Sequence, residues 1–382
     1  MSAPRVLVMT TVHVADDARI AHRGIASMVA AGMRVAYAAP FGATGADLPA
    51  TLAAIERIDL PRAQGRRRLR ALAAAVGLLR RRGAEHDLIV VHDPDLVLAV
   101  LLAGVGRLPP VVWDVHEDVV ASLPERTWLP GILRAPALGL ARRLERWAER
   151  RLRLVLAEEG YRGRFMREHP VVRNLPPTPT LGSDPAPPAS DADGDGPPPL
   201  RVVHVGRLSR GRGAMELLEL GVRLARHGIA LELVGTPDDE LASAMERAAA
   251  AGTVVLHGRM ANDRLGEVLV GALAGLALLH DLPNYRVSLP TKVVEYLVHD
   301  LPVVATPLPE VVRLAERVGG IVTVPFGDVD AAEAALLRLS RDAEERARLA
   351  DAGPRARREL VWEPEGERLV ALLAGWAREG AG

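Results

Sequence analysis

Short apolar runs alternate with longer amphipathic stretches along the whole sequence, and this alternation constrains the fold most. The runs are dominated by Val, Leu, Ile and Ala, which is the pattern of strands covered on both faces. Such strands belong to parallel sheets with crossover helices. In the first half we predict strands at 5–9, 34–39, 87–91, 110–115 and 153–157. Amphipathic helices are predicted between them, as at residues 17–31 and 133–152.

A segment rich in proline and glycine interrupts the alternation. Residues 175–199 are mostly Pro, Gly, Ser, Asp and Ala, so they cannot bury a core, and we predict a mobile linker. A second series of strands is then predicted at 200–206, 230–235, 253–258, 275–279, 302–306 and 320–324. Because 382 residues are too many for one ordinary core, two domains are expected.

The predicted fold is therefore α/β, with two doubly wound, Rossmann-like domains. The first covers residues 1–172, the linker covers 173–199, and the second domain covers 200–359. Residues 360–382 are predicted to form an amphipathic helix with two tryptophans that packs back across the domains.

The composition excludes several classes of protein. The chain has no cysteine, which removes disulfides, thiolate metal sites and cysteine nucleophiles. No apolar run approaches the roughly 18 residues that cross a bilayer. The first residues, "MSAPRVLVMTT", lead straight into a predicted strand without a basic and apolar leader, so we expect a cytoplasmic protein.

Charge is unevenly distributed although its sum is zero. Residues 1–170 hold 25 arginines against 18 acidic residues, whereas residues 171–382 hold 23 basic residues against 30 acidic ones. With only 3% aromatic residues to stack on bases, nucleic-acid binding is not expected. The basic first half fits either solvated helix faces or a patch for an anionic membrane surface or an acidic partner.

The stretch "VGRLSRGRGAMELLE" (205–219) has the pattern of a strand, a glycine-rich turn and a helix. Gly206 lets the backbone approach a ligand, and the start of the helix supplies free N–H groups. Arg207 and Arg212 are placed to hold two phosphate oxygens. The stretch is neither a Walker loop nor the GxGxxG of a nicotinamide-binding turn. The alternative is a surface turn that happens to contain arginine.

Lys292 is the only lysine, and the other 47 basic residues are arginines. Ser288 is a candidate helix cap and Pro290 suits a first turn, so Lys292 is expected within that turn. The helix dipole disfavours a cation there by about 0.3–1 kcal/mol, which an anion opposite would explain. Glu295 lies on the same face and could accept hydrogen bonds from a ribose. The alternative is an ordinary Lys–Glu pair on a solvated face.

Four stretches together resemble the retaining glycosyltransferases of the GT-B fold, family 4 type. They are "RVLVMTTVHVADDARIAHRGIASMVAAGMRVAYAAP" (5–40), "VVHDPDLVLAVLLA" with "PVVWDVHED" (90–118), "HVGRLSRGRG" (204–213) and "SLPTKVVEYLVHDLPVVATPLPEVV" (288–312). The resemblance implies two Rossmann-like domains that face across a cleft. It also implies that the C-terminal domain binds a nucleotide-sugar donor and the N-terminal domain holds an acceptor.

The resemblance also assigns residues of the donor side. The Arg and Lys that grip the donor diphosphate in the family fall on Arg207 and Arg212. The second Glu of its Glu-x7-Glu element, the ribose ligand, falls on Glu295, but the first falls on Val287, which cannot replace it. Nearby polar candidates for that role are Asn284, Tyr285 and Ser288. Lys292 is expected to reach the phosphates, and Glu310 to line the nucleotide site.

On the acceptor side, the family's histidine at the end of a central strand falls on His116, which would meet the transferred sugar. The alternative is a core histidine satisfied by the backbone. The loop after the first strand lacks the family's glycines, and its candidates are Thr11, His13, Asp17 and Arg19. Asp93 and Asp95 in "HDPD" resemble a metal-binding Asp-x-Asp, but we interpret them as helix-start or acceptor contacts. No metal and no cofactor are predicted.

The resulting hypothesis is a glycosyltransferase that moves a sugar from a nucleoside diphosphate to an acceptor hydroxyl with retained configuration. Arg207, Lys292 and His116 are its catalytic candidates, and the acceptor is a glycan, a lipid carrier or a natural product. Three alternatives stay open. They are a non-catalytic sugar-nucleotide-binding partner of a glycosylation complex, an epimerase or phosphorylase on the same fold, and a nicotinamide dehydrogenase.

Overall fold

The computed structural model describes residues 3–45, 48–116, 131–179, 200–260 and 264–380. They form two compact units, each described here by itself. Unit 1 comprises residues 1–174 and 362–382, and unit 2 comprises residues 175–361. Most of the predicted linker, residues 180–199, lies outside the described residues.

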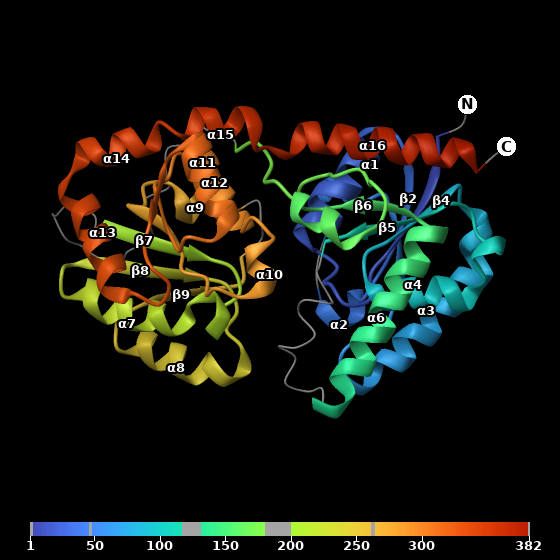
Figure 1. Ribbon diagram of the computed structural model, residues 1–382, viewed down its shortest axis with the longest axis horizontal. Coiled ribbons are helices and arrows are strands. Elements are labelled where there is room, and N and C mark those ends of the chain that lie inside the picture. Colours follow the sequence, from blue (N-terminus) through green and yellow to red (C-terminus); the bar gives the residue numbers. More distant parts are fainter. Residues whose placement is uncertain (1–2, 46–47, 117–130, 180–199, 261–263, 381–382) are drawn as a thin grey trace. The chain divides into compact units, whose positions relative to one another are not determined.

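Unit 1 contains a six-stranded parallel sheet in the order β3-β2-β1-β4-β5-β6 (Figure 1). All five predicted strands are present, and β3 was not predicted. β3 is an edge strand, ERID, whose residues are mostly exposed, so it lacks the apolar run that identifies the others. The strands are β1 (Arg5–Met9), β2 (Arg34–Ala39), β3 (Glu56–Asp59), β4 (Leu88–Val91), β5 (Val111–Val115) and β6 (Arg153–Leu156).

The helices of unit 1 cover both faces of this sheet, as crossovers between parallel strands require. The predicted helix 17–31 divides into a π-helical segment, Ala18–Ile25, and a short α1. The described helices are α1 (Ala26–Ala30), α2 (Phe41–Thr44), α3 (Arg68–Arg82), α4 (Pro94–Ala103), α6 (Gly131–Arg151) and α16 (Trp362–Glu379).

The C-terminal helix α16 belongs to unit 1 although its sequence follows unit 2. Trp362 donates from Nε1 to Ser27 Oγ at 2.9 Å, and Glu365 accepts from Arg173 Nε at 2.7 Å. Leu373 of α16 is fully buried in the core of unit 1. No helix among the described residues combines the length and apolar character needed to cross a membrane.

Unit 2 contains a second six-stranded parallel sheet, in the order β12-β11-β10-β7-β8-β9. All six predicted strands are present. They are β7 (Leu200–Val205), β8 (Ile229–Val234), β9 (Val255–Gly258), β10 (Ala274–Ala277), β11 (Val303–Ala305) and β12 (Ile321–Thr323). The helices are α7 (Ala214–Ala225), α8 (Asp239–Ala250), α9 (Leu265–Leu269), α10 (Pro283–Arg286), α11 (Thr291–Val298), α12 (Pro309–Val318), α13 (Val329–Arg341), α14 (Ala343–Ala350) and α15 (Gly353–Glu359).

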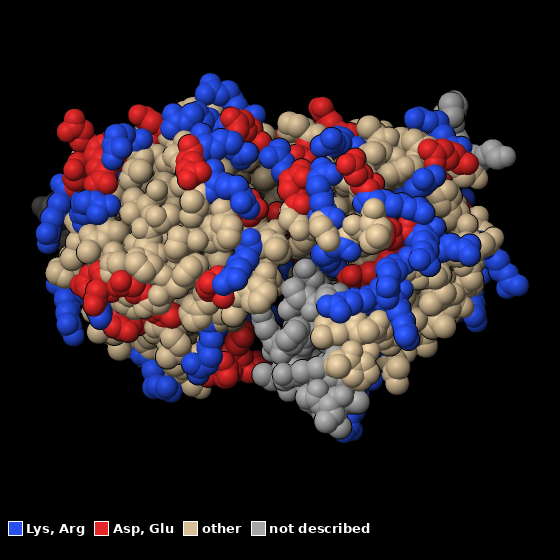
Figure 2. All heavy atoms as spheres, viewed as in Figure 1, with Lys and Arg blue, Asp and Glu red and all other residues tan. Residues whose placement is uncertain are grey.

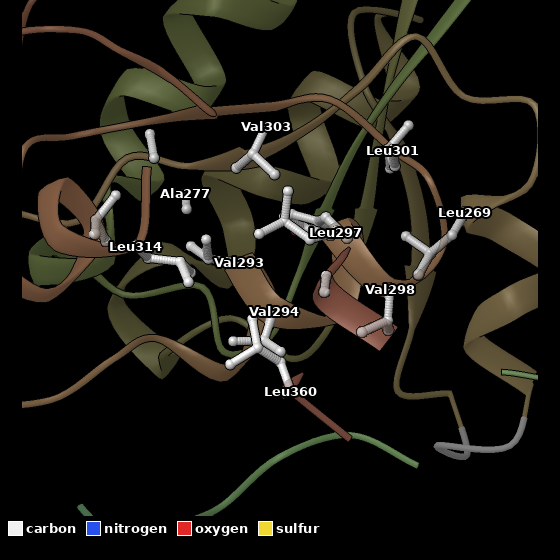
Figure 3. Packing of buried hydrophobic residues seen from close by; sticks show 14 of the residues in the cluster. Leu269, Ala277, Val293, Val294, Leu297, Val298, Leu301, Val303, Leu314 and Leu360 are labelled. Carbon is white, nitrogen blue, oxygen red and sulfur yellow. The ribbon is translucent and has the colours of Figure 1, made fainter. Parts of the chain in front are cut away.

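Helix α11 of unit 2 is buried along almost its whole length. Figure 3 shows Val293, Val294, Leu297 and Val298 of α11 packed among leucines and valines of neighbouring elements. Tyr296 is also fully buried, and its hydroxyl accepts from Val205 N at 2.8 Å and donates to Leu276 O at 3.2 Å. These contacts fix α11 against β7 and β10.

Both sheets have the doubly wound strand order, in which the connections leave the two central strands in opposite directions. The central pair is β1 and β4 in unit 1, and β7 and β10 in unit 2. Ligands of such sheets bind beyond the carboxyl ends of these strands. The two places to examine are therefore the loops after β1 and β4 and the loops after β7 and β10.

Candidate active site

In unit 2 the glycine-rich turn after β7 meets the segment after β10. The backbone N–H of His280 donates to Gly211 O at 2.9 Å, which joins the two loops. Gly213 starts α7 with a φ of +82°, and a Cβ there would lie 2.2 Å from Leu278 O. The turn thus lies directly against the chain that leads to α11.

This contact gives a direct prediction for Gly213→Ala. Alanine at this position must keep the left-handed backbone conformation, which costs about 1–2 kcal/mol. Its Cβ would also collide with Leu278, which costs about 1–3 kcal/mol more. Gly228→Ala is the matched control, because its φ is +68° but nothing lies within 4 Å of the new Cβ. Urea denaturation should show a larger loss of unfolding free energy for Gly213→Ala. Equal losses would mean that the turn can move away from Leu278.

Lys292 lies in the first turn of α11, as predicted, but in the protein interior. It is 9% exposed, and its Nζ lies 3.0 Å from His204 Nε2. A Cβ at Gly206 would lie 3.4 Å from Lys292 Nζ and 3.7 Å from Arg212 Nη1, so both cationic groups lie against this glycine. Burial and then the charge of Arg212 hold the pKa of Lys292 well below its usual range.

A Lys–Glu pair on a solvated face is therefore the wrong interpretation of this helix. Glu295 is only 7% exposed, and among the described residues Lys292 makes no ion pair. The expected cap is also wrong, since α11 is preceded by Pro290 at the cap position. Ser288 instead donates from Oγ to Asn284 O at 3.3 Å. That contact ties Ser288 to α10 rather than to α11.

The structure separates the two arginines of the turn. Arg212 lies beside Lys292 and, among the described residues, has no carboxylate partner. Arg207 has a side chain that is 67% exposed, and its Nε donates to Asp238 Oδ1 at 2.5 Å. Glu310, at the start of α12, pairs with Arg313 of its own helix. Of the predicted phosphate-binding cations, only Arg212 and Lys292 are together.

His204 is a residue of this site that the sequence interpretation missed. It is the next-to-last residue of β7 and is fully buried. The available signal was a titratable side chain inside the otherwise apolar run VVHV. Only the fold shows that this side chain lies under Lys292.

In unit 1 the loop after β1 is attached to the start of α4 through Asp93, which is fully buried. The Asp93 carboxylate accepts from Thr10 Oγ1 at 3.1 Å, from Val12 N at 3.1 Å, and from Thr11 N. Asp93 occupies the cap position of α4, but its carboxylate does not bond to that helix. Asp95 lies apart and pairs with Arg68 of α3 at 2.7 Å.

Histidine and carboxylate side chains contact one another beside this loop. His13 Nε2 lies 2.9 Å from His116 Nε2, and His13 Nδ1 lies 3.6 Å from Asp17 Oδ2. Burial would raise the pKa of Asp17, but the hydrogen bond and charge of His13 lower it well below its usual range. His116 Nδ1 lies 3.6 Å from Asp114 Oδ2. His116 is thus part of a side-chain network and not an isolated core histidine.

Arg19 and Asp114 form the buried base of this network. They are 4% and 5% exposed, and Arg19 donates to Asp114 Oδ2 at 2.8 Å and Oδ1 at 2.7 Å. Burial alone would raise the pKa of Asp114, but the Arg19 charge and the contacts with His116 and His92 hold it well below its usual range. The fold therefore unites Thr11, His13, Asp17, Arg19, Asp93 and His116, and adds the unpredicted Asp114 and His92.

Among the described residues, one group has the spacing of metal ligands: His92, Asp114 and His116, with ligand atoms within 4.8 Å of one another. Both carboxylate oxygens of Asp114 already accept from the Arg19 guanidinium. A cation bound there would face that guanidinium at close range. The donor set therefore does not fit a metal, because its one carboxylate is already paired with a guanidinium.

The sequence and the fold were compared with those of known proteins. Residues 199–342 match the family model described as glycosyl transferases group 1. No curated protein with a similar sequence was found. Many solved structures are similar in fold, three of which are described next.

The Anabaena protein Alr3699/HepE, solved in complex with UDP and glucose, has a TM-score of 0.70 at 16% identity, covering 98% of this chain and 100% of its own. Sucrose-phosphate synthase from Thermosynechococcus elongatus has a TM-score of 0.73 at 14% identity, covering 99% and 100%. WaaG, a glycosyltransferase involved in lipopolysaccharide biosynthesis, has a TM-score of 0.67 at 14% identity, covering 97% and 100%. The chain therefore has the two-domain GT-B fold, and its residues 199–342 match the model of the glycosyl transferases group 1 family.

Proposed function

We propose that this glycosyltransferase moves a sugar from a nucleoside-diphosphate sugar to an acceptor hydroxyl. The proposal depends on one observation: Lys292 and Arg212 lie side by side, with no carboxylate partner among the described residues, where a doubly wound sheet binds ligands. Two buried or half-buried cations without counter-charge are explained by an anionic ligand. HepE, a protein of the same fold, has been solved with UDP and with UDP-glucose.

The proposed chemistry follows from the leaving group. As the sugar departs, negative charge develops on the diphosphate, and preorganised donors there supply the largest catalytic effect. Lys292, Arg212 and the free N–H groups at the start of α7 would provide them. Arg207 would have to leave Asp238 to join them.

We further propose that the reaction retains the anomeric configuration and needs no metal ion. Lys292 and Arg212 supply the positive charge that a divalent ion would otherwise bring to a diphosphate. No residue of the sequence stands out as the nucleophile of a double displacement, so we propose departure and attack on one face of the sugar. Val287 stands where the resembling family has a sugar-binding Glu, so other side chains must select the sugar. Product anomer analysis by NMR and assay in excess chelator test these two points.

The acceptor is assigned to unit 1, where His13 and His116 lie beyond the ends of β1 and β5. A glycan, a lipid carrier or a natural product would meet this network. Peripheral contact of unit 1 with an anionic membrane at its cytoplasmic face is also proposed. Figure 2 shows many basic side chains over this unit, and the exposed Leu69 and Leu140 lie in arginine-rich segments. Sedimentation with anionic vesicles at low and high salt tests this contact.

The donor site is tested by a thermal-shift panel of uridine, guanosine and thymidine diphosphates. A nucleotide at 100 times its dissociation constant stabilises the folded protein by about 2.7 kcal/mol, which a melting curve resolves. The expected result is a clear rise for at least one of them, and product formation only when an acceptor is present. Absence of any rise would contradict the proposal. Epimerisation of donor incubated alone would favour the epimerase instead.

A further inference from the structure

His204 has no role in the chemistry described so far, yet it is the side chain that contacts Lys292. It is fully buried on β7, one of the two central strands at which the ligand-binding loops begin. Its Nε2 lies 3.0 Å from Lys292 Nζ. A titratable group in such a place must be neutral or must have a counter-charge.

The direction of this hydrogen bond follows from the protonation state of Lys292. When Lys292 is an ammonium it has donors and no acceptor, so His204 Nε2 is then the acceptor and carries no proton. Burial, followed by the positive charges of Lys292 and Arg212, holds the pKa of His204 well below its usual range. The imidazole therefore stays neutral at physiological pH, and its Nε2 lone pair remains available to Lys292.

The surroundings of Lys292 disfavour its charged form until an anion arrives. Arg212, from the turn after β7, lies beside Lys292, and Lys292 itself stands in the first turn of α11, at the positive end of the helix dipole. Glu295 is on the same helix, but burial and then the charge of Arg212 lower the pKa of the Lys292 amine. A neutral histidine orients the amine without supplying the negative charge that a carboxylate would.

We propose that His204 is a positioning residue that aims Lys292 at the donor diphosphate, and that donor binding places a proton on Lys292. This inference depends on the proposed function of the site. A bound diphosphate supplies a counter-charge, so the pKa of Lys292 is higher in the complex than in the free protein. Between these two values binding takes up a proton, and affinity falls as the pH rises through that interval.

The test is calorimetric titration of the full chain with UDP, or with the diphosphate of the panel that raises the melting temperature most. It is run at pH 8 in two buffers of different ionisation enthalpy, because the terminal phosphate, with a pKa near 6, is then ionised. The wild-type protein is expected to take up a measurable fraction of a proton. Lys292→Met is expected to take up none.

His204→Leu removes the acceptor at similar volume and is expected to weaken binding at least tenfold and to change the proton uptake. His204→Gln keeps an acceptor oxygen and is expected to remain within about threefold of wild type. His227→Gln is the matched control, because His227, which follows α7, is 39% exposed and pairs with Glu333. The melting temperature of each variant is measured to check that it folds.

Two results would overturn the inference: diphosphate binding without proton uptake in the wild type, or unchanged binding by a folded His204→Leu. If His204→Leu does not fold, the wild-type uptake and its loss in Lys292→Met still decide the protonation. Failure of every diphosphate to bind the wild type would instead overturn the proposed function. The two failures are therefore distinguishable.

Discussion

Replacing Lys292 with alanine is expected to lower the turnover number at least about tenfold, which corresponds to about 1.4 kcal/mol of barrier. The physical reason is that its amine is one of two cations against Gly206, and charge stabilisation at a leaving diphosphate acts mainly in the transition state. Initial rates at saturating donor measure this directly. An unchanged turnover number would remove Lys292 from the mechanism.

Lys292→Arg is expected to lose activity to a similar extent although it keeps the charge. Lys292 is 9% exposed and lies beside Arg212, so a planar guanidinium has neither the space nor a carboxylate to match its geometry. Full activity of this variant would show that charge alone is required. Arg210→Ala is the control, because Arg210 lies in the same turn but is 60% exposed and pairs with Glu240.

Arg19→Met is expected to lower the free energy of unfolding by about 3–5 kcal/mol. Breaking a buried ion pair leaves the remaining charge uncompensated, and both Arg19 and Asp114 are buried. Urea denaturation at pH 7 measures the change. Arg153→Met is the control, since Arg153 and Glu379 form an exposed pair that is worth about 0–1 kcal/mol. Equal effects of the two variants would mean that the Arg19–Asp114 pair is not buried in solution.

The same pair sets a dependence of stability on pH. The pKa of Asp114 is lower in the folded protein than its ordinary value of 3.8. Its contribution is therefore present above pH 3.8 and is lost as the pH falls below that value. Below about pH 4 the wild type should lose stability more steeply than Asp114→Asn. Parallel curves would show that Asp114 does not carry this linkage.

The sequence identified every strand of both sheets except β3, because buried parallel strands must be apolar along their whole length. Edge strand β3, with the residues ERID, does not have to be. The sequence also placed Gly206, Arg212 and Lys292 in segments that follow the carboxyl ends of strands, since the strand–turn–helix pattern is local. Lys292 stands out from the composition alone, because every other basic residue is arginine.

Contacts between distant residues could not be read in the same way. Arg207 and Arg212 are equivalent as letters, and only the fold pairs Arg207 with Asp238 and leaves Arg212 beside Lys292. His204 is 88 residues from Lys292 along the chain, so their contact depends on how α11 packs against β7.

By itself, then, the sequence determined two doubly wound domains and the loops in which the site had to be sought. The tertiary structure decided which charged side chains are buried, which have counter-charges, and that the helix bearing the single lysine points it inward onto a neutral histidine. The physical reason is that strand and helix patterns follow from neighbouring residues. The electrostatic state of a side chain follows instead from everything that folding places around it.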